Sequence, residues 1–101
     1  MIKLTVLYPT PSDPAAFDAY YHGTHAGLAA QIPGLERMEL ARGLSMIDGT
    51  PPEHHLIAEL YFADMAAFQA GLGSPQGQAT AGDVPNFATG GVTMQLCEVL
   101  D

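Results

Sequence analysis

The residues best suited to chemistry are a histidine and two tyrosines in the segment after the first strand-like stretch. A helical periodicity extends from about residue 14 to residue 31, and Tyr20 and Tyr21 lie on its apolar side. His25 follows Tyr21 by one turn and lies at the border of that side, where it would face the sheet edge. A histidine in such a place can titrate near neutral pH and act as general base or acid. The alternative is a partly buried ring bonded to a backbone carbonyl.

Four tyrosines can bring a phenol hydroxyl to a ligand carbonyl. Tyr20 and Tyr21 would do so from the helix, and Tyr8 and Tyr61 from strands. Phe87, in a later loop, is a candidate apolar contact for the same ligand. For all of them the alternative is core packing, with the tyrosine hydroxyls at the wet edge. The apolar side of the helix is expected to comprise Phe17, Tyr20, Tyr21, Thr24, Leu28 and Ile32.

Other chemistries find little support in the sequence. His22 and His25 are three residues apart on the helix, but His54 and His55 are neighbours in a strand and point to opposite faces. HExxH, CxxC, phosphate-loop and nucleophile-elbow motifs are absent, and Cys97 is the single cysteine. We therefore expect no metal site and no cofactor, and we interpret Cys97 as a small packing residue.

The charge balance restricts the partners. Eleven acidic residues face three basic ones, which gives a net charge of −8. Nucleic acid and anionic membranes attract basic surfaces, so neither is an expected partner. A high apolar content of 48% beside only 14% charged residues indicates an interface or a pocket for a small apolar or weakly polar ligand. With no disulfide framework and no signal peptide, we expect a cytoplasmic protein.

The chain of 101 residues predicts one domain over residues 1–101. Ser12 or Asp13 can cap the first helix and Asp64 the second, while Asp83 falls in a loop over residues 83–87. The expected strands are Ile2–Tyr8, Leu35–Leu44, His54–Phe62 and Val92–Leu100, and the expected helices are Pro14–Gln31, Met65–Leu72 and Ser74–Ala81.

This order predicts an α+β fold of the ferredoxin-like type, βαββαβ, in which a four-stranded antiparallel sheet has helices on one face. The other face would carry Leu7, Ile57 and Tyr61 among polar residues. We expect a second copy to cover it. In such a two-fold dimer the two sheets meet face to face and form a barrel with an interior cavity, a dimeric α/β barrel.

Two segments resemble the EthD family, and together they span nearly the whole chain. VLYPTPSDPAAFDAYYHGTHAGLAAQIPGLER, residues 6–37, resembles its first half, with a tyrosine pair, a histidine and Pro-Gly-Leu after the helix. SPQGQATAGDVPNFATGG, residues 74–91, resembles its second half, with Ser-Pro-x-Gly, an aspartate and Asn-Phe. The family often has His-x-Pro-Leu, where this chain has His25-Ala26-Gly27-Leu28. The resemblance implies the dimeric α/β-barrel superfamily, which includes isomerases, cyclases and cofactor-free monooxygenases. The EthD family takes its name from gene clusters for degrading ethyl tert-butyl ether.

The resemblance also implies a partner for the histidine. Asp83 lies at the matching family position, and a carboxylate bonded to His25 would fix its tautomer. The alternative is an aspartate that caps a turn.

From these observations and the resemblance we expect an EthD-like protein of one of three kinds. The first is a cofactor-free isomerase, cyclase or oxygenase acting on a small neutral or aromatic molecule in a catabolic pathway. The second is a non-catalytic small-molecule binding or accessory protein, and the third is a structural dimer subunit.

Overall fold

The expected order of strands and helices is confirmed. The computed structural model describes residues 1–100, and Asp101 lies outside the described residues. The strands are β1 (Ile2–Tyr8), β2 (Leu35–Arg42), β3 (Leu56–Phe62) and β4 (Thr93–Glu98). The helices are α1 (Pro14–Tyr20), the π-helical turn η1 (Tyr21–His25), α2 (Ala26–Ala29), α3 (Met65–Gly73), α4 (Pro75–Asp83) and the 3-10 turn η2 (Val84–Asn86).

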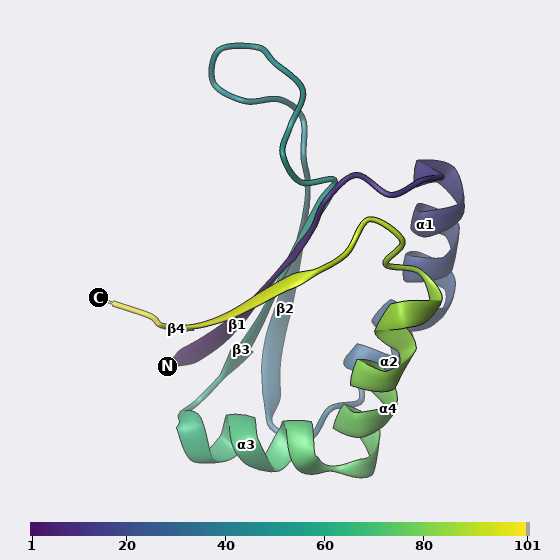
Figure 1. Ribbon diagram of the computed structural model, residues 1–101. Coiled ribbons are helices and arrows are strands. Elements are labelled where there is room, and N and C mark those ends of the chain that lie inside the picture. Colours follow the sequence, from purple (N-terminus) through teal and green to yellow (C-terminus); the bar gives the residue numbers. More distant parts are fainter. Residues whose placement is uncertain (101) are drawn as a thin grey trace.

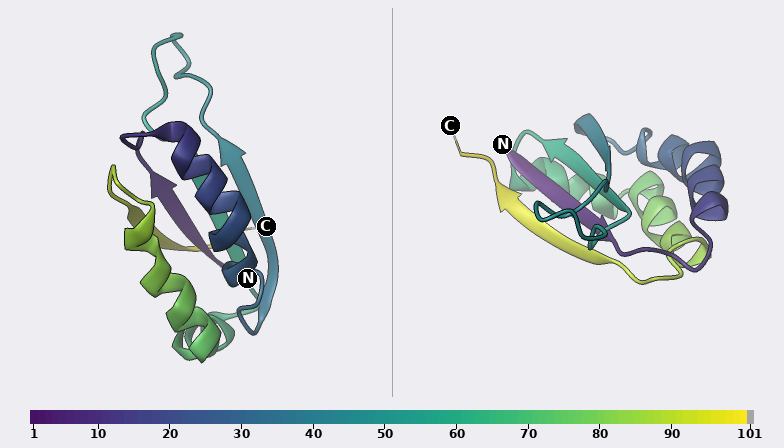
Figure 2. Two further views of the ribbon diagram at one scale, coloured as in Figure 1. Left: turned by 90° about the vertical axis from the view of Figure 1, so that its right-hand side faces the viewer. Right: turned by 90° about the horizontal axis from the view of Figure 1, so that it is seen from above.

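The four strands form one antiparallel sheet in the order β2-β3-β1-β4. Figures 1 and 2 show the helices on one face of this sheet. Residues alternate between the two faces of a strand, so Leu4, Val6 and Tyr8 of β1 point together toward the helices. Their partners in β3 are Leu60, Ala58 and Leu56, and all six are buried. These residues form the sheet half of the core, and all of them except Leu56 also form the floor of the candidate site.

Short polar side chains fix where the helices begin. The Asp13 carboxylate accepts a hydrogen bond from the backbone N–H of Ala16 at 3.1 Å, so Asp13 rather than Ser12 caps α1. Asp64 caps α3 in the same way, through the N–H of Ala67 at 2.8 Å. Ser74 caps α4. Capping of this kind satisfies the first N–H groups of a helix, which have no partner inside it. Asp64 thus caps the helix that the sequence assigned to it.

The first helical segment differs from the expected regular helix. It ends at Ala29, and its middle turn is a π-helix in which the N–H of Ala26 donates to the carbonyl of Tyr21, five residues earlier. Thr24, expected on the apolar side, is exposed, and His25 is buried. Along a regular α-helix each residue turns by about 100°, so positions spaced by four drift around the axis. The wider π turn cancels part of this drift and brings His25 to the inner side.

Asp83 lies in a helix and not in the expected loop. It is the last residue of α4, which continues two residues beyond the predicted end at Ala81, and it is not part of a loop. Pro85 follows Asp83 by two residues, and a proline disfavours a helical conformation in the residue before it. Here Pro85 is instead accommodated in the 3-10 turn η2 that follows α4 directly. No helix among residues 1–100 combines the length and apolar character needed to cross a membrane.

Candidate functional site

His25 lies deep between the helices and the sheet, with only 4% of its surface exposed. The inner side of the first helical segment is a row with a spacing of four, Phe17, Tyr21, His25 and Ala29. The sequence placed His25 at the border of the apolar side because it assumed a regular helix. The π turn moves the ring into the core, where it packs on Phe87 with a distance of 4.5 Å between ring centroids. A histidine in this position is shielded from bulk water.

Asp83 binds His25 directly. The Nδ1 atom of His25 lies 2.9 Å from Oδ2 of Asp83, so the contact that the family position implied is confirmed. The other carboxylate oxygen, Oδ1, accepts hydrogen bonds from the Tyr20 hydroxyl at 2.6 Å and from the Asn86 amide at 3.0 Å. The carboxylate is thus held from three sides, and it orients the imidazole ring.

The hydrogen bonds around Asp83 determine its charge. Burial alone would raise the pKa of this carboxyl, but hydrogen bonds from Tyr20, Asn86 and His25 outweigh it and lower the pKa below its ordinary value. Asp83 is therefore ionised at neutral pH and can only accept hydrogen bonds. A neutral His25 must then carry its proton on Nδ1. This leaves the lone pair of Nε2 available to accept a proton.

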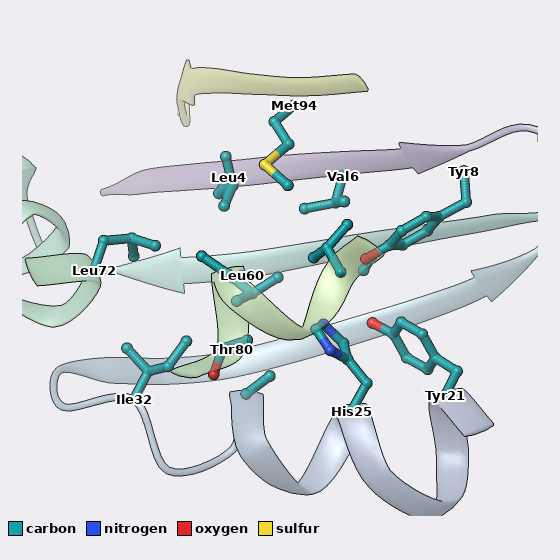
Figure 3. Close-up of a pocket in the computed structure, with 14 residues that line it drawn as sticks. Leu4, Val6, Tyr8, Tyr21, His25, Ile32, Leu60, Leu72, Thr80 and Met94 are labelled. Atoms are coloured by element: carbon teal, nitrogen blue, oxygen red, sulfur yellow. The ribbon is translucent and has the colours of Figure 1, made fainter. Parts of the chain in front are cut away.

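An apolar pocket lies beside His25 on the helix side of the sheet. Its volume is about 50 Å³, measured as room for the centres of water-sized spheres. One water needs roughly 10–15 Å³ on this measure, so the pocket holds a few waters or part of a small molecule. Figure 3 shows His25 at its helix side and Met94 at its β4 side. The lining residues are Leu4, Val6, Tyr8, Tyr21, His25, Ala29, Ile32, Ala58, Leu60, Leu72, Thr80, Ala81, Val84 and Met94.

Two phenol hydroxyls share this pocket with His25. Tyr8 reaches it from β1 and Tyr21 from η1, and Figure 3 shows both hydroxyls directed toward the region of the His25 ring. Neither hydroxyl has a side-chain hydrogen bond within residues 1–100, where every fully buried polar side-chain atom has a partner. The two hydroxyls therefore reach space that water can enter. Burial raises the pKa of Tyr21 to about 12, and it also raises that of Tyr8, so both remain hydrogen-bond donors.

The other predicted ligand contacts lie outside this pocket. Tyr20 holds Asp83 instead, and Phe87 is buried in an aromatic cluster with Tyr8, Phe17, Tyr21 and His25. Tyr61 lies on the opposite face of the sheet, where its hydroxyl lies 3.0 Å from a carboxylate oxygen of Glu59 and Arg37 stacks on its ring at 4.1 Å. The structure thus brings together His25, Asp83, Tyr8 and Tyr21, with Tyr20 and Phe87 behind them. It leaves Tyr61 on the face expected to meet a second copy.

Of the lining residues, the sequence had singled out Tyr8, Tyr21 and His25 as site residues, and Thr80 and Met94 are among those it missed. Thr80 precedes Asp83 by three residues on α4, so the two share a face, and a longer predicted helix would have shown this. Met94 pairs with Val6 across the sheet and therefore points to the same side. The alternation of residues along the expected last strand could have shown that Met94 faces the helices. The expected cavity was the interior of a two-sheet barrel, whereas this pocket lies between the sheet and the helices of a single chain.

A second groove lies on the outer side of Asp83. It is shallower and more polar, with a volume of about 190 Å³ on the same measure, and its lining includes Ser12, Tyr20, Asn86 and Thr89. Tyr20 and Asn86 thus separate the buried carboxylate from this groove. Among residues 1–100, no three His, Cys, Asp or Glu side chains lie close enough together to hold a metal ion. The chemistry that the arrangement supports is proton transfer inside the apolar pocket.

The sheet order and the helices on one face define a ferredoxin-like α+β protein. Residues 10–91 match the EthD domain, and the chain belongs to the EthD family. An uncharacterized 11.0 kDa protein in the thcB-thcC intergenic region of Rhodococcus erythropolis is 44% identical over 94 residues, which are 93% of this chain and 90% of that protein. The crystal structure of an ethyl tert-butyl ether degradation (EthD) family protein from Bacillus halodurans has a TM-score of 0.94, with 34% identity and 99% of each chain covered.

More distant structures share the fold. SnoaB, a cofactor-independent oxygenase from Streptomyces nogalater, has a TM-score of 0.70 at 18% identity, covering 99% of this chain and 93% of its own. A dimeric ferredoxin-like protein of unknown function from Jannaschia has a TM-score of 0.68 at 19% identity, covering 97% of this chain and 98% of its own. At such identities the likeness shows the architecture and not the chemistry.

Proposed function

We propose that this chain is a cofactor-free enzyme that moves a proton to or from a small neutral or aromatic molecule bound beside His25. The observation that carries the proposal is the state of that ring. One nitrogen of the buried imidazole is fixed by the Asp83 carboxylate at 2.9 Å, and the ring lines an apolar pocket together with two phenol hydroxyls. A structural histidine needs no such pocket and no such hydroxyls.

The proposed step is a general-base reaction. Nε2 of His25 accepts a proton from a C–H or O–H group next to a carbonyl or aromatic ring, and the negative charge moves onto the oxygen of the ligand. The hydroxyls of Tyr8 and Tyr21 donate hydrogen bonds to that oxygen. Because Asp83 is ionised, it stabilises the imidazolium that forms and does not take the proton itself. Isomerisation, cyclisation and deprotonation before attack of oxygen all begin in this way.

The ligand class follows from the lining. The pocket walls are almost entirely aliphatic and aromatic, and the whole chain has three basic residues against eleven acidic ones. Lys3 is bound to Glu59 and Arg42 to Asp18, and Arg37 stacks on Tyr61 on the far face of the sheet. An anionic ligand would find no positive partner in the pocket. A neutral ring with one carbonyl or hydroxyl would match both the walls and the hydroxyls.

The proposal includes the setting in which the enzyme works. The chain acts as one domain, in the cytoplasm, within a catabolic pathway. Two copies form a homodimer by packing the outer faces of their sheets together. The support is the outer face itself, where Leu7, Ile57 and Tyr61 lie among charged residues, and the dimeric description of a protein with the same fold. The pocket lies on the helix side of the sheet, so the sheet-to-sheet contact itself does not cover it.

Deuterium exchange tests the proton transfer without knowledge of the natural substrate. A panel of small enolisable ketones, such as 2-tetralone and cyclohexanone, is incubated with the protein in buffered D₂O, and proton NMR follows the loss of the signal next to the carbonyl. We expect catalysed exchange with the wild type. His25→Ala should abolish it, and His22→Ala should leave it unchanged, because His22 is exposed on the same helix and does not line the pocket.

Two results separate the alternatives. Equal exchange rates for the wild type and His25→Ala would refute the proposal. Binding of the ketones in the pocket, seen as shifts of the amide signals of Tyr8 and Tyr21, without exchange above buffer would identify a binding protein. Circular dichroism of each variant shows whether a lost rate reflects a lost fold.

A further inference from the structure

The loop between β2 and β3 carries large apolar side chains that are exposed to solvent. Leu44 is 85% exposed, and Ile47 is fully exposed. Figure 1 shows this loop, Gly43–His55, projecting past the end of the sheet and bending toward the side away from the helices. Large exposed apolar side chains grouped on a projecting loop favour contact with another surface.

The loop is built as an ordered arm. At its base the N–H of Gly43 donates to the carbonyl of His55 at 3.0 Å, and at its tip the N–H of Met46 donates to the carbonyl of Thr50 at 2.9 Å. The Asp48 carboxylate accepts from both the N–H and the hydroxyl of Thr50, at 3.1 and 2.7 Å. An arm that is already ordered loses little entropy when its apolar tip binds, so it is suited to an interface.

A matching apolar surface lies on β4 and on Val92, the residue before it. Val92, Met94 and Leu96 are all exposed, and Met94 is 49% exposed although it lines the pocket beside His25. Met94 and Leu96 point to the helix side of the sheet, because they pair with Val6 and Leu4. The pocket therefore has an open flank at β4. Within residues 1–100, β4 is an edge strand, and so is β2 at the other edge.

The direction of the two-fold axis in a sheet-to-sheet dimer determines which part of the second copy lies beside this flank. A two-fold axis parallel to the strands places β2 of one copy beside β4 of the other, with corresponding ends together. The loop and the start of β4 are at the same end of the sheet, since Tyr8 pairs with Leu56 and Leu7 pairs with Thr93. This axis brings the arm of one copy to Val92 and Met94 of the other. An axis across the strands would bring it to the charged Glu36 end of β2 instead.

We propose that the arm of each copy packs on Val92 and Met94 of the second copy and closes the open flank of its pocket. The inference rests on the homodimer of the proposed function and extends it, because each site is then completed by a side chain of the other copy. Leu44 and Ile47 add apolar surface at the mouth, so the completed site selects neutral ligands more strongly than one chain alone.

Cross-linking between two single-cysteine variants tests the placement. In a Cys97→Ser background, Ile47→Cys with an affinity tag is mixed with untagged Val92→Cys or Glu36→Cys, left to exchange subunits, and treated with a short bis-maleimide. We expect the 47–92 pair to cross-link and the 47–36 pair and the 47–47 pair not to do so. Cross-linking of 47–36 in a dimer, or absence of the 47–92 product from it, overturns the arm placement but leaves the dimer. A monomer in sedimentation experiments overturns both.

The double variant Leu44→Ser with Ile47→Ser tests the energetics. Both side chains are exposed within one chain, so the fold should be unchanged, and the dimer should dissociate at least about tenfold more readily. Met65→Ser, which removes an exposed methionine at the start of α3, is the matched control and should not change dissociation. Equal dimer dissociation constants for the double variant and the wild type would reject the arm contact. None of these measurements depends on turnover, so they succeed or fail separately from the proton transfer.

Discussion

Asp83→Asn is the substitution that examines the site most directly. The amide has the shape of the carboxylate but no charge, and it has an N–H₂ group where the carboxylate has a second acceptor. Its Oδ1 can still accept from Tyr20 and Asn86, while its N–H₂ would face Nδ1 of His25. Nδ1 must then accept, and the proton of a neutral His25 moves to Nε2. The nitrogen that should act as the base becomes a donor.

The cost in stability can be worked from the three hydrogen bonds. A bond to a charged group contributes about 1.5–3 kcal/mol and one between neutral groups about 0.5–1.5 kcal/mol, so each bond loses roughly 1 kcal/mol. The sum is reduced because a neutral amide is easier to bury than a carboxylate. We expect a net loss of about 1–3 kcal/mol in the free energy of unfolding. For a domain of this size, that is a fall in melting temperature of roughly 4–8 °C per kcal/mol.

The loss of unfolding free energy in Asp83→Asn should depend on pH, and the pKa of Asp83 gives the direction of that dependence. The pKa of Asp83 is lower in the folded chain than in the unfolded chain, where it is about 4. The carboxylate therefore contributes its full stability above about pH 4, and this contribution is lost as the pH falls through the folded pKa. The part of the difference in unfolding free energy between the wild type and Asp83→Asn that comes from the carboxylate charge should shrink below pH 4.

Two assays decide whether this reasoning holds. Urea unfolding followed by circular dichroism gives the free energies at each pH, and nitrogen-15 NMR of the imidazole gives the tautomer. We expect the Nδ1–H form in the wild type and the Nε2–H form in the variant, together with loss of ketone exchange. An Nε2–H form in the wild type, or a stability difference that is the same at pH 3 and pH 7, would show that the carboxylate does not control His25.

Four further substitutions test the hydrogen bonds and the packing of the helices and the site. Phe87→Ala should cost about 3–5 kcal/mol in urea unfolding, because Phe87 is the ring on which His25 and its aromatic neighbours pack. Tyr20→Phe keeps the ring but removes a donor to Asp83, so carbon-13 NMR should show the pKa of that carboxyl moving upward. Gly27→Ala should stabilise the protein by about 0.8–1 kcal/mol, because a methyl group there meets open space in a helix. Gly77→Ala, by contrast, should cost about 1–3 kcal/mol, because its methyl group would overlap backbone atoms of α3.

The strands and the helix starts were predictable because local patterns determine them. The alternation of Ile2–Tyr8 and of Leu56–Phe62 fixed both the strands and their inner faces. Asp64 gave the start of α3. The strand expected from Leu35 is confirmed as Leu35–Arg42, and the edge position of β2 accommodates the charged residues on both of its sides. In each of these cases the residues that decide the structure are neighbours in the sequence.

The site was less predictable, because it depends on two departures from regular structure. The π turn moves His25 by a fraction of a turn, and residue spacing alone assumes a regular helix. The last turn of α4 carries Asp83, which was expected in a loop. The contact between the two residues came from the resemblance to the EthD family, since 58 residues separate them in the chain. The pocket was expected between two sheets, and single-chain periodicity cannot distinguish that location from the helix side.

The two departures are connected through the same carboxylate. A histidine on a regular helix at position 25 would lie at the border of the buried side, close to water, and would need no buried partner. The π turn instead places it in the core, where an imidazolium formed during proton transfer would be strongly destabilised without a nearby anion. The end of α4 supplies that anion, and Tyr20 and Asn86 keep it ionised. The combination of a buried base, an ionised partner and an apolar pocket is what proton transfer requires, and it links the irregular helix to the proposed function.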